Sequence, residues 1–254
     1  MNGKGVNAGT GTSRAAPQHR LRDLRGWGER SEQNLAQSIA ATQAGGGRIQ
    51  LAVALDLAEE MVAALSSAPG VARVTYAGSL RRMRDTVGDI GLLVAADEAG
   101  PVMDAFVDMP LVARVLAHGP TKSSVVTTKG IQVDLRVIER SVWGAALLYF
   151  TGSKAHNIRI RDIALRAGLK LSEYGLFEVD SGALVVAERE EDVYARLGLP
   201  WIPPAIREDG GEVEAALEGS LPHLVELRDI RGDLHTHTDL TDGVAPLEEM
   251  VTGD

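Results

Sequence analysis

Two kinds of apolar spacing divide this chain into predicted helices and predicted strands. Apolar residues three and four positions apart lie on one helical face and predict helices. Such stretches occur at 52–65, 102–109, 142–150, 155–167 and 212–217. Short apolar or alternating runs, which are typical of strands, occur at 71–77, 90–95, 112–116, 124–128, 131–138, 170–171, 176–179 and 184–187. Helices and short strands therefore interleave along most of the chain.

The first fifty residues follow a different pattern. Residues 1–20 are rich in Gly, Ser, Thr and Ala and have little periodic apolar content, so we expect a disordered tail. A Gly-Trp-Gly turn at 26–28 precedes Ser31, which is a good N-cap for a following helix. The glycine run at 45–47 is typical of a linker.

Composition excludes several classes of protein. With 254 residues, 44% of them hydrophobic, the chain can bury the core of one large domain or of two to three small ones. The absence of cysteine excludes a disulfide scaffold, a Cys-ligated zinc site and thiol catalysis. No apolar run approaches the roughly 18 to 20 residues of a membrane span, and the N-terminus lacks the apolar core of a signal peptide. We therefore expect a soluble, cytoplasmic protein with no membrane partner.

Charge is distributed unevenly along the chain. The net charge of -9 divides into +4 over 1–48, -4 over 49–119, +6 over 120–172 and -15 over 173–254. Because clustered Lys and Arg side chains displace the counterions of a polyanion, the two basic segments could bind nucleic acid while the acidic segment stays in solvent. The alternative is that all four segments are solvated charged faces.

The segment 77–94, AGSLRRMRDTVGDIGLLV, combines residues suited to phosphate and metal. Gly78 permits close backbone approach, Ser79 offers a hydroxyl, and Arg82 supplies a forked donor that matches phosphate. Asp89 opens the next predicted strand, where a carboxylate could hold Mg²⁺ against a triphosphate. The alternative is a simple Gly-Ser turn with surface arginines.

A second acidic residue lies in a predicted strand. Asp134 is flanked by Val and Leu, and a buried carboxylate is costly unless it is paired or bound to metal. Asp89 and Asp134 could therefore converge on one cation. A structural salt bridge to Arg136 or to another nearby base explains Asp134 equally well.

The segment 149–161, YFTGSKAHNIRIR, joins two rings to a polar helix. Tyr149 and Phe150 could stack on a sugar or base, and His156, Asn157 and Arg159 could donate into a groove. The alternative is a core aromatic pair followed by a solvated basic helix.

Two further patterns are weaker. The backbone N–H groups of Gly26, Trp27 and Gly28 could face a phosphate oxygen. In DLHTHTDLTDG, alternate histidines of a strand share one side, so His235 and His237, with Asp242 nearby, could share a metal. A polar strand end is the alternative, and such a site needs further ligands.

Together these segments resemble the bacterial family X DNA polymerases, both in their order along the chain and in their amino-acid sequences. GSLRRMRDTVGDI is similar to the family's glycine-serine motif and first metal strand, and TKSSVVTTKGIQVDLRV to its second metal strand. YFTGSKAHN resembles the nucleotide-selection motif, and GLPWIPPAIREDGGEVEAA the end of the catalytic core. GWGERSEQN resembles a helix-hairpin-helix element, and GDLHTHTDLTDG the opening of a polymerase and histidinol phosphatase (PHP) domain.

The resemblance implies an α+β fold: a nucleotidyltransferase palm with a mixed β-sheet and helices, a small thumb-like α/β subdomain and an N-terminal helix-hairpin-helix element. It implies attack of a primer 3'-hydroxyl on a dNTP by a two-metal mechanism with Mg²⁺ or Mn²⁺. The implied metal ligands are Asp89 and Asp134. The implied nucleotide contacts are Gly78, Ser79, Arg82, Tyr149, Phe150, Gly152, Ser153 and Asn157. The implied DNA contacts are Gly26, Trp27, Gly28 and Arg159.

Three departures from the family pattern change the expected activity. The first metal strand of the family reads Gly-Asp-x-Asp, whereas this chain has Gly91 at the second acidic position, so a bridging carboxylate is missing. A low-complexity tail replaces the family's lysine-bearing N-terminal domain. The PHP segment stops after its first motif, so we expect no metal to be held by His235, His237 and Asp242 and no nuclease activity.

The predicted organisation has five parts. They are a disordered tail (1–20), the helix-hairpin-helix element (21–47), the palm (48–140), the thumb-like nucleotide-selection subdomain (141–228) and a truncated start of the PHP domain (229–254). We expect a monomeric, catalytically impaired polymerase core that fills DNA gaps in repair and whose partners are DNA and dNTP. The alternatives are a non-catalytic DNA-binding module and a decayed gene fragment.

Overall fold

The structure is a computed structural model that describes residues 47–232 and 235–252. It divides into two compact units, one ending at Gly219 and the other beginning at Ser220. The expected tail (1–20) and nearly all of the helix-hairpin-helix element (21–47), including Gly26, Trp27 and Gly28, lie outside the described residues.

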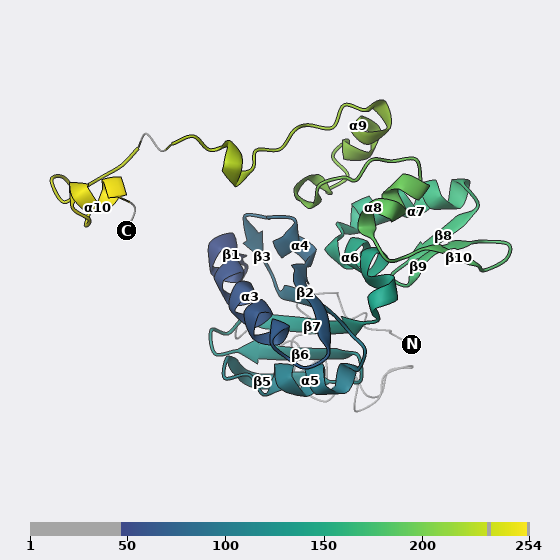
Figure 1. The fold of residues 1–254 in the computed structure, drawn as a ribbon, viewed down its shortest axis with the longest axis horizontal. Helices are drawn as coiled ribbons and strands as arrows, with labels where there is room; N and C mark the ends of the chain where they lie inside the picture. The colour runs from purple at the N-terminus through teal and green to yellow at the C-terminus, as the bar shows by residue number, and fades with distance from the viewer. Residues whose placement is uncertain (1–46, 233–234, 253–254) are drawn as a thin grey trace, which may run out of the picture. The chain divides into compact units, whose positions relative to one another are not determined.

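The first unit is built on a mixed five-stranded sheet (Figure 1). Its strands, in spatial order, are β2 (Val71–Ala77), β4 (Ile90–Ala96), β7 (Gln132–Ile138), β6 (Lys122–Thr127) and β5 (Val112–His118). Strands β4 and β7 run parallel and the other neighbours are antiparallel. This mixed sheet with helices confirms the predicted α+β fold.

The two faces of the sheet are covered by different helices. Successive strand residues point to opposite faces, so Leu92 and Leu93 of β4 enter different cores. Leu92 packs in the larger core with α3 (Leu51–Ser66) and α5 (Ala99–Val107). Leu93 packs on the opposite face against Trp143 and Ala146 of α6 (Trp143–Thr151). Helix α6 therefore packs on that second face.

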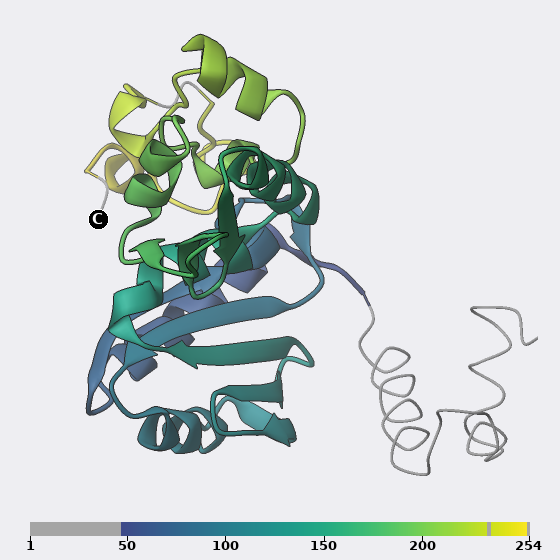
Figure 2. The same ribbon diagram turned by 90° about the vertical axis from the view of Figure 1, so that its right-hand side faces the viewer.

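The second half of the first unit follows β7 along the chain and can be traced in Figure 2. After the 3₁₀ turn η2 (Arg140–Val142), α6 and α7 (Lys154–Arg166) form a helical pair. A three-stranded antiparallel sheet then orders β10 (Leu184–Val186), β9 (Gly175–Glu178) and β8 (Leu169–Ser172). Helix α8 (Glu190–Arg196), the 3₁₀ turn η3 (Pro204–Ile206) and α9 (Glu212–Glu218) complete the unit.

Short elements lie between β2 and β4. Helix α4 (Gly78–Arg81) follows β2 directly, and β3 (Thr86–Val87) pairs with β1 (Ile49–Gln50). The sequence pattern predicted a turn at Gly78 and neither of the two short strands. Elements of two to four residues are too short to show a period, which explains the difference.

Other predicted boundaries differ by a few residues, and helix α8 was among the elements that the pattern missed. Helix α5 begins at Ala99, ahead of the predicted 102, because Pro101 is tolerated in a first helical turn. Helix α8 was not predicted, because its sequence EEDVYAR has two adjacent apolar residues and no helical spacing. Those residues, Val193 and Tyr194, are nevertheless fully buried.

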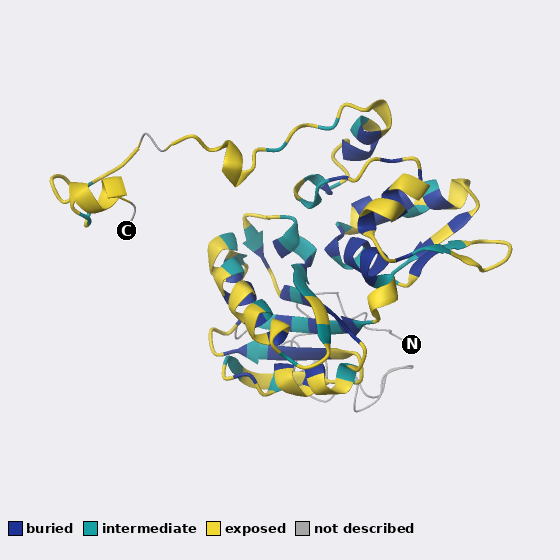
Figure 3. Ribbon diagram, in the orientation of Figure 1, coloured by how far each residue is buried: buried dark blue, intermediate teal, exposed yellow. Residues whose placement is uncertain are grey.

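None of the described residues of the second unit is buried, and most are exposed, as Figure 3 shows by their yellow colour. It contains the 3₁₀ turn η4 (Leu227–Asp229) and helix α10 (Leu247–Thr252). The prediction of a strand through His235 and His237 is wrong, because these residues lie in irregular chain. A strand needs a hydrogen-bonded neighbour, and the described residues of this unit offer none.

No helix within residues 47–232 and 235–252 is long and apolar enough to cross a bilayer.

Candidate functional site

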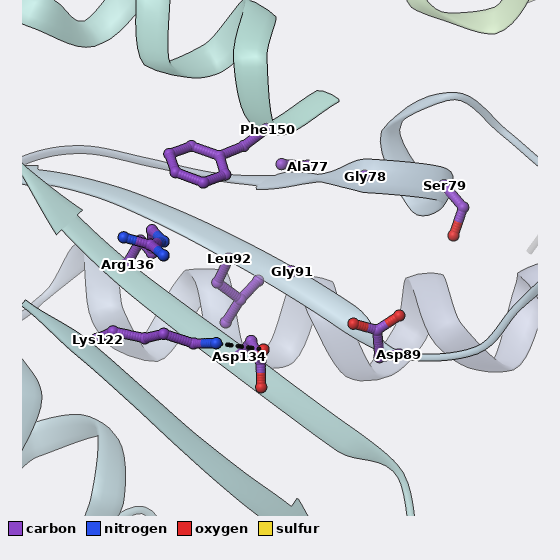
Figure 4. A pocket seen from close by; sticks show the side chains of 10 residues that line it. All are labelled: Ala77, Gly78, Ser79, Asp89, Gly91, Leu92, Lys122, Asp134, Arg136 and Phe150. Carbon is purple, nitrogen blue, oxygen red and sulfur yellow. Dashed lines mark ion pairs between the residues drawn. The ribbon is translucent and has the colours of Figure 1, made fainter. Parts of the chain in front are cut away.

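A cavity of ≈ 260 Å³ opens where β2 and β4 meet α4, on the sheet face shared with α6. Figure 4 shows the side chains that line it. They are Ala77, Gly78, Ser79, Asp89, Gly91, Leu92, Lys122, Asp134, Arg136 and Phe150. Ala77 and Phe150, which are 73 positions apart in sequence, therefore line the same cavity.

The two predicted metal ligands line this same cavity. Asp89 immediately precedes β4, and Asp134 lies in the middle of β7. In the parallel pairing of these strands Gly91 is the partner of Asp134. Because alternate strand residues share a face, Asp89, Gly91 and Asp134 all face the cavity. The parallel register thus brings the two carboxylates together, as the interpretation of two metal strands requires.

The electrostatics of Asp89 reflect this convergence. The residue is solvent-accessible, but packing around its carboxyl group raises its pKa, and the neighbouring charge of Asp134 raises it further. The cations Lys122 and Arg48 oppose the shift. A carboxylate whose charge is disfavoured in this way is suited to accept a cation.

Asp134 has protein partners of its own. Its Oδ2 lies 3.2 Å from Lys122 Nζ, and its Oδ1 accepts a hydrogen bond of 3.0 Å from Gln132 Nε2. The base that pairs with Asp134 is therefore Lys122 and not Arg136. This ion pair accounts for a carboxylate in an apolar strand without a metal, so both interpretations of Asp134 remain compatible with the geometry.

Gly91 leaves an open space between the two acids. A Cβ atom built on Gly91 would meet no heavy atom within 4 Å among the described residues. A longer side chain at this position would point into the cavity, since Gly91 faces it from β4. In residues 47–232 and 235–252 no group of three or more His, Cys, Asp or Glu side chains is arranged to hold a metal ion.

The glycine-serine motif forms the rim of the cavity. Gly78 has a φ of 61°, a conformation that favours glycine, and it turns the chain from β2 into α4. Ser79 follows and lines the cavity, where its hydroxyl is available to a ligand (Figure 4). The predicted roles of Gly78 and Ser79 therefore fit their positions.

Arg82 lies elsewhere. Its guanidinium donates from Nη1 to the carbonyl oxygen of Thr151, at 2.6 Å, and its Nε lies 2.7 Å from Glu208 Oε1. It does not line the cavity, although it was predicted to hold the triphosphate. In this structure Arg82 instead connects the glycine-serine segment to the end of α6.

Of the two predicted aromatic contacts, Phe150 lines the cavity and Tyr149 does not. Phe150 lines the cavity, and the ring of Tyr149 meets it edge to face with centroids 5.1 Å apart. The guanidinium carbon of Arg136 lies 4.9 Å from the Phe150 ring centroid, within the range of a cation–π contact. Arg136 thus presents a positive charge inside the cavity.

The remaining predicted nucleotide contacts surround the first turn of α7. Gly152 has a φ of 70°, and the Gly152–Ser153 peptide is cis. Ser153 caps α7 by accepting a bond from the His156 N–H at 3.2 Å. Asn157 is buried, donates from Nδ2 to the Tyr149 carbonyl oxygen at 2.7 Å, and leaves its Oδ1 without a hydrogen-bond partner among the described residues.

The other predicted contacts are partly or fully exposed. Arg159 on α7 forms an ion pair with Glu214 of α9. In the second unit His237 Nδ1 lies 2.5 Å from Asp242 Oδ1, and the Nε2 atoms of His235 and His237 are 2.9 Å apart. These three side chains are thus neighbours, but they form no metal-binding group with other described residues.

Sequence reasoning missed two basic residues beside the carboxylates. Lys122 lies in the basic segment 120–172, and its alternation with Ser124 and Val126 places it on the cavity face, which is a signal the sequence did contain. Arg48 donates to Thr86, and its charge opposes the rise in the pKa of Asp89. It directly follows the glycine run, where no pattern marks it.

The chain is similar in sequence to a known polymerase thumb family and to a bacterial polymerase. The family described as DNA polymerase beta thumb matches residues 146–208, which extend from α6 to the segment after η3. The DNA polymerase/3'-5' exonuclease PolX of Bacillus subtilis is 36% identical over 248 residues, covering 97% of this chain and 43% of that protein.

More distant relatives are also polymerases. Rat DNA polymerase lambda is 28% identical over 59% of this chain and 31% of its own length. Human DNA-directed DNA/RNA polymerase mu is 38% identical over 31% of this chain and 16% of its own length. The chain thus spans less than half the length of these relatives.

The matched thumb and the similarity over nearly the whole chain agree with the mixed sheet and with the paired carboxylates of Asp89 and Asp134. They confirm the resemblance drawn from the sequence motifs: this chain belongs to the bacterial family X DNA polymerases.

Proposed function

We propose that this chain is the core of a family X DNA polymerase that binds DNA and dNTP but is impaired in nucleotidyl transfer. The observation that carries the proposal is the position of Gly91, which faces the cavity beside Asp134 where the family motif has an acid. Gapped DNA of the kind filled in repair is the proposed substrate. Residues 21–47 as a DNA-binding hairpin and 229–254 as the start of a PHP domain are parts of the same proposal.

The cavity contains groups suited to a nucleoside triphosphate. The Ser79 hydroxyl can donate to a phosphate oxygen, and the Lys122 and Arg136 cations can balance the phosphate charge. The ring of Phe150 closes the opposite side and offers a flat apolar surface to a sugar. These residues support binding of the nucleotide whether or not transfer follows.

The acidic residues do not fit the two-metal centre that the family uses. Two carboxylates line the cavity, one of them already paired with Lys122, and the third position is glycine. Removal of one preorganised electrostatic group from an active site typically costs about 10²- to 10³-fold in rate. We therefore expect very slow primer extension by this chain.

Primer extension on gapped DNA with Mg²⁺ or Mn²⁺ tests the proposal. The comparison is between the native chain, Gly91→Asp and Gly91→Asn, because Asn has the shape of Asp without its charge. Open space around the Gly91 Cβ position leaves room for the Cβ atom of both side chains. We expect Gly91→Asp to extend the primer at least about 10²-fold faster than the other two.

Three results would contradict parts of this proposal. Extension by the native chain as fast as by Gly91→Asp would show that the missing acid does not limit the reaction. No extension by any of the three proteins, when all are folded and bind DNA, would favour a second candidate function, a non-catalytic DNA-binding module. A chain that does not fold would favour a decayed gene fragment.

The second candidate has its own supporting observation. Lys122 and Arg136 are direct partners in the β6–β7 ladder and lie on the same open face of the sheet. Such paired cations bind a phosphate backbone without needing catalysis. Salt-dependent DNA binding that is unchanged by Gly91→Asp, with no extension, would support it.

A further inference from the structure

A buried histidine lies between two of the proposed nucleotide contacts. His156 is 0% exposed, immediately precedes Asn157, and follows Ser153 by three residues. Its backbone N–H donates to the Ser153 hydroxyl oxygen at 3.2 Å, which caps α7. The position of His156 therefore influences the whole first turn of this helix.

Both ring nitrogens of His156 have partners. Nδ1 lies 2.6 Å from Glu212 Oε1, and Nε2 lies 2.8 Å from the Tyr194 hydroxyl oxygen. Burial lowers the pKa of His156, against the opposing hydrogen bond to Glu212, and burial also raises the pKa of Tyr194. Because a carboxylate only accepts, the neutral ring carries its proton on Nδ1, and the Tyr194 hydroxyl donates to Nε2.

The partners of His156 are themselves held in place. Glu212 accepts hydrogen bonds from the backbone N–H groups of Asp209, at 2.9 Å, and Gly210, at 2.8 Å. The Tyr194 ring faces the guanidinium of Arg207, whose carbon lies 5.1 Å from the ring centroid. Every donor and acceptor of the His156 ring is therefore used by a group with little freedom to move.

The segment that follows η3, which contains Arg207 and Glu212, also contacts the backbone of Ser153. The Ser153 N–H donates to the Arg207 carbonyl oxygen at 2.9 Å. The stretch from Arg207 to Glu212 thus contacts the first turn of α7 at two points, at the Ser153 backbone and at the His156 ring. Two such contacts fix both the position and the rotation of this turn, since hydrogen bonds are directional.

Asn157 depends on that rotation. Its Nδ2 donates to the Tyr149 carbonyl oxygen at 2.7 Å, while its buried Oδ1 has no partner among the described residues. A buried acceptor without a partner is costly, and a donor on a bound ligand would relieve that cost. A small turn of α7 would move Oδ1 and lengthen the bond to Tyr149.

We propose that His156 is a positioning residue for nucleotide recognition, which acts through Tyr194 and Glu212 to orient Ser153 and Asn157 toward the incoming nucleotide. The inference rests on the proposed function, because it requires these two residues to meet the nucleotide. It assigns a role to a buried polar network that touches no atom of the reaction.

The test measures nucleotide selection at equilibrium. The full chain is bound to a primer–template whose primer ends in a dideoxynucleotide, so that no transfer occurs. The affinities for complementary and mismatched dNTP are then measured with Mg²⁺. The ratio of the two affinities is the readout, because a general loss of folded protein lowers both affinities and leaves their ratio unchanged.

The variants remove one hydrogen bond each. Tyr194→Phe deletes the hydroxyl and keeps the ring, with Tyr174→Phe at an exposed tyrosine as its matched control. Glu212→Gln keeps the shape of the side chain, with Glu218→Gln at an exposed position of the same helix as its control. We expect the affinity ratio to fall about fivefold in each test variant, the effect of one lost hydrogen bond, and to stay at the native value in the controls.

The possible results distinguish failure of the positioning role of His156 from failure of the proposed function. If folded Tyr194→Phe keeps the native affinity ratio, the positioning role is overturned and the proposed function is unaffected. If Tyr194→Phe does not fold, the same result in Glu212→Gln overturns the positioning role. If the native chain itself shows no preference for the complementary dNTP, the proposed function fails and the inference fails with it.

Discussion

Arg81 at the end of α4 and Glu190 at the start of α8 form a two-point ion pair across 109 residues of sequence. Nη1 lies 2.9 Å from Oε1, and Nη2 lies 3.0 Å from Oε2. The buried Glu190 carboxylate also accepts from Arg207 Nη1 at 2.6 Å and from Trp201 Nε1 at 2.8 Å. One carboxylate therefore connects the glycine-serine segment beside the cavity to the matched thumb region.

The Glu190 carboxylate makes stability depend on acid pH. Burial alone would raise its pKa, but hydrogen bonds from Arg207 and Arg81 and their charges lower it from 4.5 to about 2. A depressed pKa stabilises the fold above about pH 4.5, and that contribution of about 3 kcal/mol is lost as pH falls toward 2. Urea unfolding of native protein and Glu190→Gln at pH 7, 5, 4 and 3 checks this.

We expect Glu190→Gln to be less stable at pH 7, because two guanidinium groups lose their countercharge, and to lose less stability on acidification. Glu191→Gln, at the exposed neighbouring position, is the control and should behave like the native chain. Parallel pH profiles for the native chain and Glu190→Gln would show that Glu190 titrates normally.

The same substitution at two helical glycines should have opposite effects. A Cβ on Gly144 of α6 would lie 2.1 Å from the backbone carbon of Arg189, so Gly144→Ala forces α6 and α8 apart. We expect a loss of about 1 to 3 kcal/mol or more in the free energy of unfolding. A Cβ on Gly100 of α5 meets nothing within 4 Å among the described residues, so Gly100→Ala should stabilise by up to about 1 kcal/mol.

Thermal or urea unfolding of both glycine variants measures the difference. An unchanged free energy of unfolding in Gly144→Ala would mean that α6 and α8 can separate without loss, contrary to the close backbone contact seen here.

Adding the missing acid should make stability respond to divalent metal. Gly91→Asp places a third carboxylate in the cavity beside Asp89 and Asp134, and like charges there disfavour the folded state without metal. Metal that binds only the folded protein stabilises it by about 2.7 kcal/mol at 100 times its dissociation constant. Melting curves with Mg²⁺ and with EDTA should therefore differ more for Gly91→Asp than for the native chain or Gly91→Asn. A shift of equal size in all three proteins would place the metal elsewhere.

Lys122 should matter for binding more than for folding. Its ion pair with Asp134 is partly exposed, and such pairs typically contribute about 0 to 1 kcal/mol. If Lys122 contacts a phosphate, Lys122→Ala should weaken DNA binding and reduce the slope of log affinity against log salt by about 1. Lys129→Ala, in the exposed β6–β7 turn of the same basic segment, is the control. Equal salt slopes for the two variants would exclude a phosphate contact by Lys122.

Local patterns predicted most regular elements, because each long helix or strand repeats its apolar spacing several times. Helix α3 and strands β2, β4 and β7 lie within a residue or two of their predicted ranges. Helix α8 shows the limit of such patterns, since its two buried apolar residues are adjacent and its acidic residues would be expected in solvent. Only the fold shows that Glu190 is buried between arginines.

The sequence by itself determined the family, and it predicted the loss of one acidic residue from the site. Ordered motifs named the family and several of the residues that line the cavity, and Gly91 marked the position where the family motif has an acid. Short motifs are enough to identify the family because each motif contains its functional groups within a few residues.

The tertiary structure decided which of these groups meet. Parallel pairing of β4 with β7 brings Asp134 beside Gly91, and the sheet register places Lys122 in the cavity, while Arg82 is drawn to Thr151 and away from it. The His156 network likewise joins α7, α8 and α9. Strand register and helix packing bring together residues far apart in sequence, and no local pattern of the chain encodes those distances.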